Sequence, residues 1–300
     1  MAERVIAIVN PVAGRGHGAR LRPVLLAELS RLFPGIQVLE SGAPGDATIL
    51  AASAADAKLV VAVGGDGTVR EVVAGLVGTG TPFAVVPIGS GNDFLKTAGV
   101  PADPLEACRV AAHGTPRTID AVRVLATGPG HESSHVYANA AGFGFDARVA
   151  QEAGRLPHLR GLPLYVAAVF RAVREYQCPL VRITIGNRRW EQRVLLVAAN
   201  NGRFYGGGMK IAPEATPDDG LLEICVIDAV GRLTIFRSLP SFIRGTHTAL
   251  KEVTMYRSAR LELEFLEPVM AQLDGDLLLD SGLSRFRLEV LPGALRVMSG

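Results

Sequence analysis

An apolar run followed at once by a glycine cluster constrains this chain more than any other feature. Residues 59–63 read Leu-Val-Val-Ala-Val, and residues 64–68 read Gly-Gly-Asp-Gly-Thr. The run is typical of a buried parallel strand, and the glycines predict a tight turn before a helix that starts at Thr68. Backbone N–H groups and the helix dipole would then converge on one anion-sized spot. A carboxylate there, that of Asp66, predicts a divalent cation or a proton-handling role, and so a nucleotide phosphate site.

The first part of the chain alternates between strand and helix patterns. Short β-rich runs occupy residues 5–9, 36–40, 59–63 and 83–88, and leucines at helical spacing run from Leu21 to Leu32. This alternation predicts an open α/β layer with a mostly parallel sheet. Ligands of such sheets bind at the carboxyl ends of the strands, so the glycine-rich loops 10–18, 64–68 and 89–93 should share one crevice.

The sequence pattern changes near residue 120, where short strand-like runs separated by turn residues become dominant. The expected strands are 136–140, 181–185, 193–199, 221–227, 261–266 and 286–290, with helices around 162–176 and 233–245. This mixture predicts a second domain that is largely antiparallel β, a β-sandwich. We therefore expect an α/β domain over residues 1–122 and a second domain over 123–283, with residues 284–300 packing back on the first.

Composition excludes some partners and compartments. The chain has 300 residues, of which 48% are hydrophobic. Its 31 basic and 29 acidic residues leave a net charge of only +2, so there is no general electrostatic attraction for a nucleic-acid partner. The three cysteines are scattered without metal spacing, which favours a reducing cytoplasm. The longest apolar stretch, 162–170, is about half of the roughly 20 residues that a membrane helix needs, so contact with a membrane would be peripheral.

The other two loops carry weaker signals when each is taken alone. The loop 10–18, Asn-Pro-Val-Ala-Gly-Arg-Gly-His-Gly, lacks the spacing of a dinucleotide fingerprint and the glycine-Lys-Ser/Thr ending of a P-loop. A plain glycine turn is the competing interpretation. In the loop 87–94, Pro-Ile-Gly-Ser-Gly-Asn-Asp-Phe, the pair Asn92-Asp93 is also compatible with ordinary helix caps. The expected convergence with residues 64–68 favours a joint site.

Together these motifs resemble the catalytic domain of the diacylglycerol kinase family, which includes soluble bacterial lipid kinases and the sphingosine and ceramide kinases. The resemblance rests on NPVAGRG at 10–16, GGDGT at 64–68 and PIGSGNDF at 87–94, in that order. It continues through FYGGGM at 204–209, PEA at 213–215, DDGLL at 218–222 and DGD at 274–276. It therefore covers essentially the whole chain, and Ser90 stands where many members carry Thr.

The resemblance implies an enzyme that moves the γ-phosphoryl group of ATP to a lipid hydroxyl, with Mg²⁺ as the metal and the nucleotide between the two domains. It assigns Asp66 and Asp93 to the catalytic network and Asp274 to the general base, although a D-G hairpin turn competes at Asp274. The implied nucleotide-binding residues are Asn10, Pro11, Gly14, Arg15, Gly16, Ser41, Gly64, Gly65, Asp66, Gly67, Thr68, Gly89, Ser90, Gly91 and Asn92.

The resemblance also implies a metal network. It places Asp120 among the groups that organise magnesium, with an interdomain hydrogen bond as the competing account. It places Asp219, with Thr216 and Leu221, at a second, structural Mg²⁺ site, and oxygen-only coordination suits such a hard cation. Asp219-Gly220 is also a common turn dipeptide, so a simple turn remains open.

Residues 155–174 combine arginines with leucines and aromatic residues, which would suit an anionic bilayer, although an ordinary packed helix fits equally well. We therefore expect a cytoplasmic lipid kinase, peripheral to the inner face of the membrane and acting on diacylglycerol. An NAD kinase, or a non-catalytic lipid-binding protein on the same fold, is the alternative. An exposed strand edge would also allow two copies to pair as a homodimer.

Overall fold

The computed structural model describes residues 4–89, 91–156, 158–159, 161–174, 176–278 and 282–300. The chain divides into two compact units. The N-terminal unit comprises residues 1–121 and 292–300, and the C-terminal unit comprises residues 122–291. Strands β5 (Thr115–Gly128) and β15 (Arg285–Ser299) each contribute residues to both units. The sequence placed the boundary after residue 122 and the return of the chain at 284; the division itself lies after Ala121 and after Leu291.

The N-terminal unit is built on a parallel sheet. Its strands are β1 (Val5–Val9), β2 (Gln37–Glu40), β3 (Leu59–Gly64) and β4 (Pro82–Pro87), in the order β2-β1-β3-β4, and the end of β15 adds to β4. Helices α1 (His17–Leu32) and α5 (Pro104–His113) cover one face, where Leu25 and Ala111 join the inward residues of the strands. Helices α2 (Asp46–Ser53) and α3 (Asp66–Leu76) form a second pair, and α4 spans Asp93–Ala98. The parallel sheet that the strand-helix alternation predicted is confirmed.

The second unit contains two antiparallel sheets. One sheet joins β5, β6 (His131–Tyr137), β8 (Leu180–Ile185), β12 (Arg260–Phe265) and β15. The other joins β7 (Ala140–Gly144), β10 (Leu222–Asp228), β11 (Val253–Ser258), β13 (Ala271–Leu273) and β14 (Asp276–Leu277). The long strand β9 (Arg188–Asn200) belongs to both, because its first half pairs with β8 and its second half with β7 and β10.

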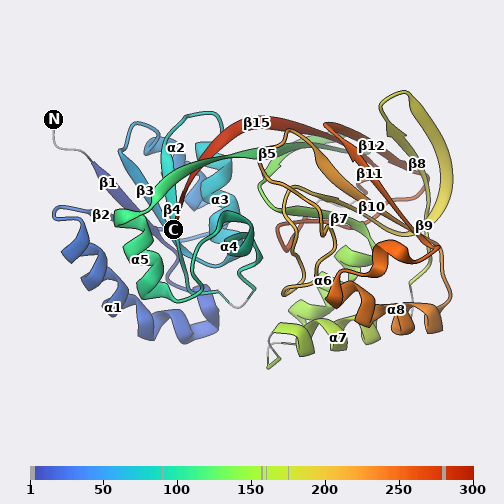
Figure 1. Ribbon diagram of the computed structural model, residues 1–300, viewed down its shortest axis with the longest axis horizontal. Coiled ribbons are helices and arrows are strands. Elements are labelled where there is room, and N and C mark those ends of the chain that lie inside the picture. Colours follow the sequence, from blue (N-terminus) through green and yellow to red (C-terminus); the bar gives the residue numbers. More distant parts are fainter. Residues whose placement is uncertain (1–3, 90, 157, 160, 175, 279–281) are drawn as a thin grey trace. The chain divides into compact units, whose positions relative to one another are not determined.

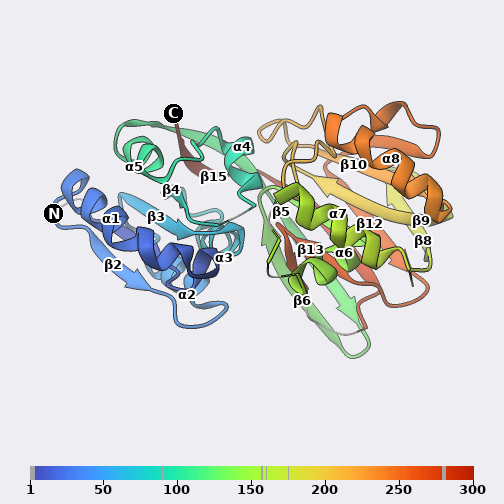
Figure 2. The same ribbon diagram turned by 90° about the horizontal axis from the view of Figure 1, so that it is seen from below.

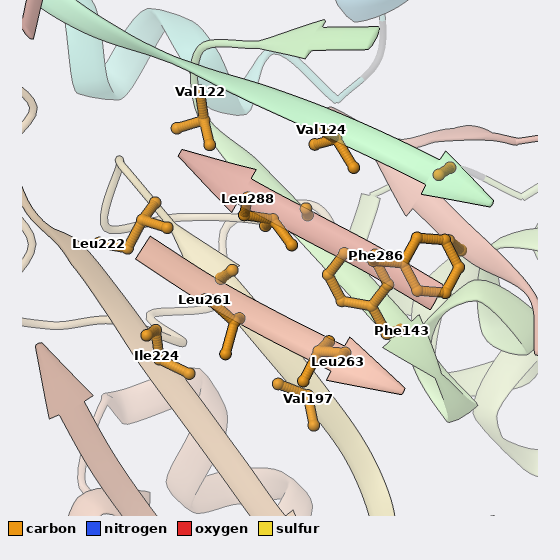
Figure 3. Close-up of a cluster of buried hydrophobic side chains, with 14 of the residues drawn as sticks. Val122, Val124, Phe143, Val197, Leu222, Ile224, Leu261, Leu263, Phe286 and Leu288 are labelled. Atoms are coloured by element: carbon orange, nitrogen blue, oxygen red, sulfur yellow. The ribbon is translucent and has the colours of Figure 1, made fainter. Parts of the chain in front are cut away.

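A hydrophobic core fills the space between these sheets (Figure 3). Val122, Phe286 and Leu288 reach it from one sheet, and Phe143 and Leu222 from the other. The rings of Phe143 and Phe286 lie 4.7 Å apart between centroids, a favourable distance for tilted aromatic rings. Alternation of inward and outward side chains along each strand builds this core and gives the expected β-sandwich.

Helices cover the outer face of the second sheet. They are α6 (Phe145–Gly154), α7 (Gly161–Ala172) and α8 (Arg232–Arg244), and they enclose a second core that includes Val149, Val169 and Ile227. The described residues also include short 3-10 turns at Ala13–Gly16 and His247–Ala249. Helices α7 and α8 match the expected ones within a few residues, whereas α6, β11 and β13 were not expected.

Two local expectations were wrong. Helix α3 begins at Asp66 and not at Thr68, because Gly65 serves as the N-cap residue. The strand expected over 136–140 is interrupted, because Ala138 and Asn139 form a bend between β6 and β7. Both differences affect the candidate site. The first places the Asp66 carboxylate in the first turn of a helix, and the second turns three backbone N–H groups toward a distant side chain.

Candidate active site

The loops after β1, β3 and β4 meet at the carboxyl edge of the parallel sheet. The side-chain amide of Asn10 donates to the Thr68 hydroxyl at 3.1 Å, which links the first loop to the second. The backbone N–H of Asn92 donates to Asp66 Oδ2 at 2.7 Å, which links the second loop to the third. Parallel strands place these loops side by side, and the two hydrogen bonds hold them in contact.

Glycines at this edge are required by close packing. A Cβ on Gly64 would lie 2.3 Å from the Thr68 side chain, and one on Gly89 would lie 2.7 Å from the Cα of Gly65. A Cβ on Gly91 would lie 2.5 Å from Asp66 Oδ2. Larger residues would force the loops apart, so the sequence leaves bare backbone at the start of α3, where N–H groups and the helix dipole favour an anion.

Two residues, one in each unit, adopt a strained backbone. Among the described non-glycine residues, a positive φ occurs at Asn92, with 53°, and at Asp274, with 48°. Asn and Asp tolerate this left-handed conformation better than other side chains, but it remains uncommon and is concentrated at functional sites. The strain therefore coincides with two residues that the motifs singled out.

The other predicted nucleotide residues of the N-terminal unit lie around these loops. Pro11, Gly14, Arg15 and Gly16 follow β1, the backbone N–H of Ser41 donates to Val9 O at 3.0 Å, and Gly67 lies in the first turn of α3. Asp93 is 8% exposed, and Oδ1 of its carboxylate pairs with Lys96 Nζ at 3.0 Å. Ser90 lies outside the described residues. Their part in nucleotide binding remains a prediction.

The Asp274 carboxylate, in the C-terminal unit, is held by three backbone N–H groups. Ala138 N donates to its Oδ2 at 3.0 Å, Asn139 N to its Oδ1 at 3.0 Å and Ala140 N to its Oδ1 at 2.8 Å. Asp274 and Gly275 form the turn between β13 and β14, so the D-G hairpin that competed in the sequence is present. Asp274 thus both forms the hairpin turn and, through its carboxylate, holds the 138–140 bend. Its role as a general base remains a prediction.

Asparagines that the sequence analysis missed surround this bend. Asn139 donates from its side chain to Phe204 O at 2.8 Å, and Asn201 donates to Ala138 O at 2.9 Å. Asn200 is fully buried, and neither atom of its side-chain amide has a hydrogen-bond partner among the described residues. Two asparagines directly after the apolar run 194–199 were a usable signal, because polar residues at the end of a buried strand often contact ligands.

Behind the Asp274 turn lies a buried carboxylate, Asp146. Gln272 Nε2 donates to its Oδ2 at 2.7 Å, and Gln272 Oε1 accepts the Gly275 N–H at 2.8 Å, so Asp146 supports the turn through one glutamine. Burial raises the pKa of Asp146 to about 6, and hydrogen bonds from Tyr205 and Gln272 only partly offset this. Neither Asp146 nor Gln272 was recognised in the sequence.

An apolar cavity of about 50 Å³ lies between the helices and the second sheet of the C-terminal unit. Tyr165 and Val169 of α7, Leu239 and Phe242 of α8, and residues of β9 and β10 line it. Its polar groups include Tyr165 and Tyr205, and the Tyr205 hydroxyl bonds to Asp146. The cavity is therefore small and mainly apolar, with a few polar groups in its wall.

The predicted metal ligands are already engaged. Asp120 is 2% exposed, and its Oδ1 accepts the Gly293 N–H at 2.7 Å. Asp219 Oδ1 accepts the Leu221 N–H at 3.0 Å, as in a simple turn, and its Oδ2 pairs with Arg257 at 2.5 Å. Within the described part of the chain, no group of three His, Cys, Asp or Glu residues is close enough to hold a metal ion.

These contacts fit the two predicted Mg²⁺ positions differently. At Asp219, Arg257 already pairs with the carboxylate, so a metal ion there would have to displace the guanidinium group. At the glycine loops, Asp66 and Asp93 offer carboxylate oxygens of the kind that Mg²⁺ prefers. Magnesium at Asp219, with Thr216 and Leu221, and at Asp120 remains a prediction.

The structure combines an α/β unit that has a glycine-rich edge with an antiparallel β-sandwich unit. A model of the diacylglycerol kinase catalytic domain matches residues 4–124, and one of the YegS C-terminal NAD kinase beta sandwich-like domain matches residues 139–299. The chain belongs to this diacylglycerol kinase family and is a lipid kinase, a phosphotransferase.

Named relatives and solved structures agree with this assignment. A diacylglycerol kinase of Mycobacterium tuberculosis is 30% identical over 91% of this chain and 88% of its own. A probable lipid kinase YegS-like of Stenotrophomonas maltophilia is 32% identical over 84% of this chain and 83% of its own. A solved structure from Bacillus anthracis str. Sterne matches at TM-score 0.80 and 25% identity, over 99% of this chain and 97% of that one.

A more distant structure shows how far the fold extends. Yeast NADH kinase matches at TM-score 0.58 and 11% identity, over 99% of this chain and 83% of that one, which shows a shared fold alone. Across the described ranges, the structure holds no helix of the length and hydropathy that crossing a bilayer requires.

Proposed function

We propose that this kinase transfers the γ-phosphoryl group of ATP to the free hydroxyl of diacylglycerol, giving phosphatidic acid. The observation that carries the acceptor class is the apolar cavity of the C-terminal unit, because a dinucleotide acceptor would need polar and charged partners instead. About 50 Å³ holds only a small part of an acyl chain, so binding requires α8 to move outward. None of the residues of α8 is fully buried, but five apolar ones pack against the second core, so an outward movement exposes part of that surface.

The N-terminal unit supplies the nucleotide side of the reaction. The bare backbone at Gly65, Gly89 and Gly91 and the N-terminus of α3 would bind the phosphates of ATP. Asp66 and Asp93 would hold Mg²⁺, which neutralises charge on the transferring phosphoryl group when it is bound. The hydrogen bond from Asn92 N orients the Asp66 carboxylate before any ligand arrives.

Asp274 would accept the proton of the attacking alcohol. Three N–H donors fix the direction of its carboxylate. A positioned acceptor of this kind contributes on the order of 100-fold or more to the rate. Asp146 and Gln272 would keep the turn that carries Asp274 in place.

A direct assay tests the assignment. The purified protein is incubated with Mg²⁺, labelled ATP and either diacylglycerol vesicles or NAD. We expect labelled phosphatidic acid in the organic extract and a large loss of label in the Asp66→Asn variant. Labelled NADP would identify an NAD kinase, and binding of diacylglycerol without any phosphoryl transfer would identify a non-catalytic lipid-binding protein.

Assembly and location form a separate part of the proposal. We propose a homodimer formed through an exposed strand edge; β2, at the edge of the parallel sheet, has three exposed residues among its four. The molar mass in solution tests this. We also propose that the protein works in the cytoplasm, at the inner face of the membrane where diacylglycerol is found.

A further inference from the structure

Helix α8 has two contrasting faces. Ile235, Leu239 and Phe242 line the apolar cavity, whereas Leu233, Arg237 and Arg244 are exposed. The exposed residues are four and seven positions apart, a spacing that places them on one stripe of a helix. Leu233 is 72% exposed and does not line the cavity, so its apolar side chain faces solvent. The outer stripe of α8 is thus basic with an apolar residue at its start.

Helix α7 and the residues just after it present the same combination. Tyr165 and Val169 face the cavity, but Phe170 is 54% exposed, and Arg171 and Arg174 are exposed beside it. An exposed phenylalanine next to two cations, on a helix whose other side is buried, resembles the pattern of helices that lie at a lipid–water interface. Residues 165–174 therefore contain one inward and one outward set of side chains.

The two outer stripes form one continuous surface. The rings of Phe170 and Phe236 stack with centroids 4.3 Å apart, and Arg232 donates to Arg174 O at 2.8 Å. Figures 1 and 2 show α7 and α8 on the same side of the C-terminal unit. We call this surface the α7–α8 face; it consists of Phe170, Arg171, Arg174, Arg232, Leu233, Arg237 and Arg244.

The charge of this face has one sign. Neither α7 nor α8 contains an aspartate or a glutamate, and the face carries five arginines. Exposed single apolar residues are ordinary on protein surfaces, but two of them set among five cations without an acid on either helix favour an anionic apolar partner. An anionic bilayer has this chemistry, because phosphate headgroups pair with guanidinium groups and the acyl layer receives Phe and Leu.

We propose that the α7–α8 face docks on an anionic lipid bilayer. Phe170 and Leu233 enter the layer below the headgroups, and the arginines remain among the phosphates. The docked helices are the ones that wall the apolar cavity, so a lipid can pass from the bilayer to the cavity without crossing water. This last step rests on the proposed function, whereas docking itself does not.

Vesicle sedimentation without ATP tests the docking. The protein is mixed with vesicles of phosphatidylcholine alone or of phosphatidylcholine with phosphatidylglycerol, and it should sediment with the anionic vesicles only. The variant Arg237→Gln/Arg244→Gln should bind about 30-fold more weakly, the equivalent of about 2 kcal/mol at about 1 kcal/mol for each arginine. Its matched control is Arg188→Gln/Arg189→Gln, two exposed arginines at the start of β9, which should bind as the wild type does.

A second variant tests the apolar contribution. Leu233→Asp should lose most of the binding, whereas Leu266→Asp, at a leucine of similar exposure, 66%, should keep it. Equal melting temperatures of the four variants and the wild type establish that folding is retained. Equal binding of the wild type to both kinds of vesicle, or wild-type binding in both face variants, would overturn the proposal, as would a wild type that binds neither vesicle.

Failure of the docking proposal and failure of the proposed function remain distinguishable. The face variants should phosphorylate a short-chain, water-soluble diacylglycerol at the wild-type rate, because that substrate needs no bilayer. If the wild type phosphorylates no diacylglycerol in any form but binds anionic vesicles through this face, the proposed function fails and the docking surface stands. If the face variants retain vesicle binding while the enzyme is active, the docking proposal fails alone.

Discussion

The anchoring of Asp274 makes Asp274→Asn a test of how this fold holds its hairpin. The amide keeps one acceptor oxygen for the N–H groups of Asn139 and Ala140, but its NH₂ group then faces the N–H of Ala138. A buried N–H without an acceptor costs about 1–3 kcal/mol, and the two remaining bonds lose their charge assistance. We expect a total loss of about 3 kcal/mol.

The loss should appear in thermal unfolding. For a unit of this size, about 3 kcal/mol lowers the melting temperature by roughly 6–12 °C. Hydrogen exchange at residues 138–140 should accelerate in parallel. Asp228→Asn is the matched control, because this exposed carboxylate accepts one side-chain bond, from Gln192 at 3.0 Å, and should change stability by less than about 0.5 kcal/mol. Equal melting temperatures for Asp274→Asn and the wild type would refute the reasoning.

Turnover separates anchoring from proton transfer at the same residue. The protein should remain folded below the lowered melting temperature, and a general base would show there as a loss of about 100-fold or more in kcat. A variant with lowered stability and near-normal kcat would leave Asp274 an anchor and remove it from the chemistry.

Three further predictions concern the buried and glycine positions. Burial raises the pKa of the Asp146 carboxyl from 3.8 to about 6. Between these two pH values the folded protein therefore holds a proton that the unfolded chain has already released. The group's stabilisation is therefore complete below pH 3.8 and is lost as the pH rises to about 6; Asp146→Asn should remove about 3 kcal/mol of that pH dependence in denaturant titrations, and an unchanged dependence would contradict the burial argument. Gly91→Ala should weaken ATP binding about tenfold by calorimetry, because its Cβ displaces Asp66 Oδ2, whereas Gly231→Ala, in open space, should not; equal affinities would count against the loop geometry. Asn200→Leu should raise the free energy of unfolding by about 1–2 kcal/mol and lower kcat, and a destabilised variant would mean that its amide is bonded in the folded protein.

Much of the N-terminal unit could be predicted because its signals are local. Each buried strand is a short apolar run. The loops after β3 and β4 need glycine because they pack so closely that a Cβ on Gly89 would lie 2.7 Å from the Cα of Gly65. The rule that such loops gather at the carboxyl edge of a parallel sheet then placed Asn10 beside Thr68 without coordinates.

The C-terminal unit was harder to predict, because its important contacts join distant residues. Ala140 and Asp274 are 134 positions apart, and no local pattern showed that the strand expected over 136–140 would break to turn N–H groups toward that carboxylate. Asp146 likewise carried no signal in the sequence, which did not predict helix α6. Its burial and its bond to Gln272 follow from the packing of α6 against the second sheet.

The sequence by itself therefore determined the strand-helix alternation of the N-terminal unit, the glycine loops and the family, since apolar periodicity and backbone freedom act over a few neighbouring residues. The tertiary structure alone decided which N–H groups hold Asp274, that Arg257 occupies the Asp219 carboxylate, and that α7 and α8 expose a basic and apolar face. These are outcomes of long-range packing, in which a side chain's environment depends on segments that only folding brings together.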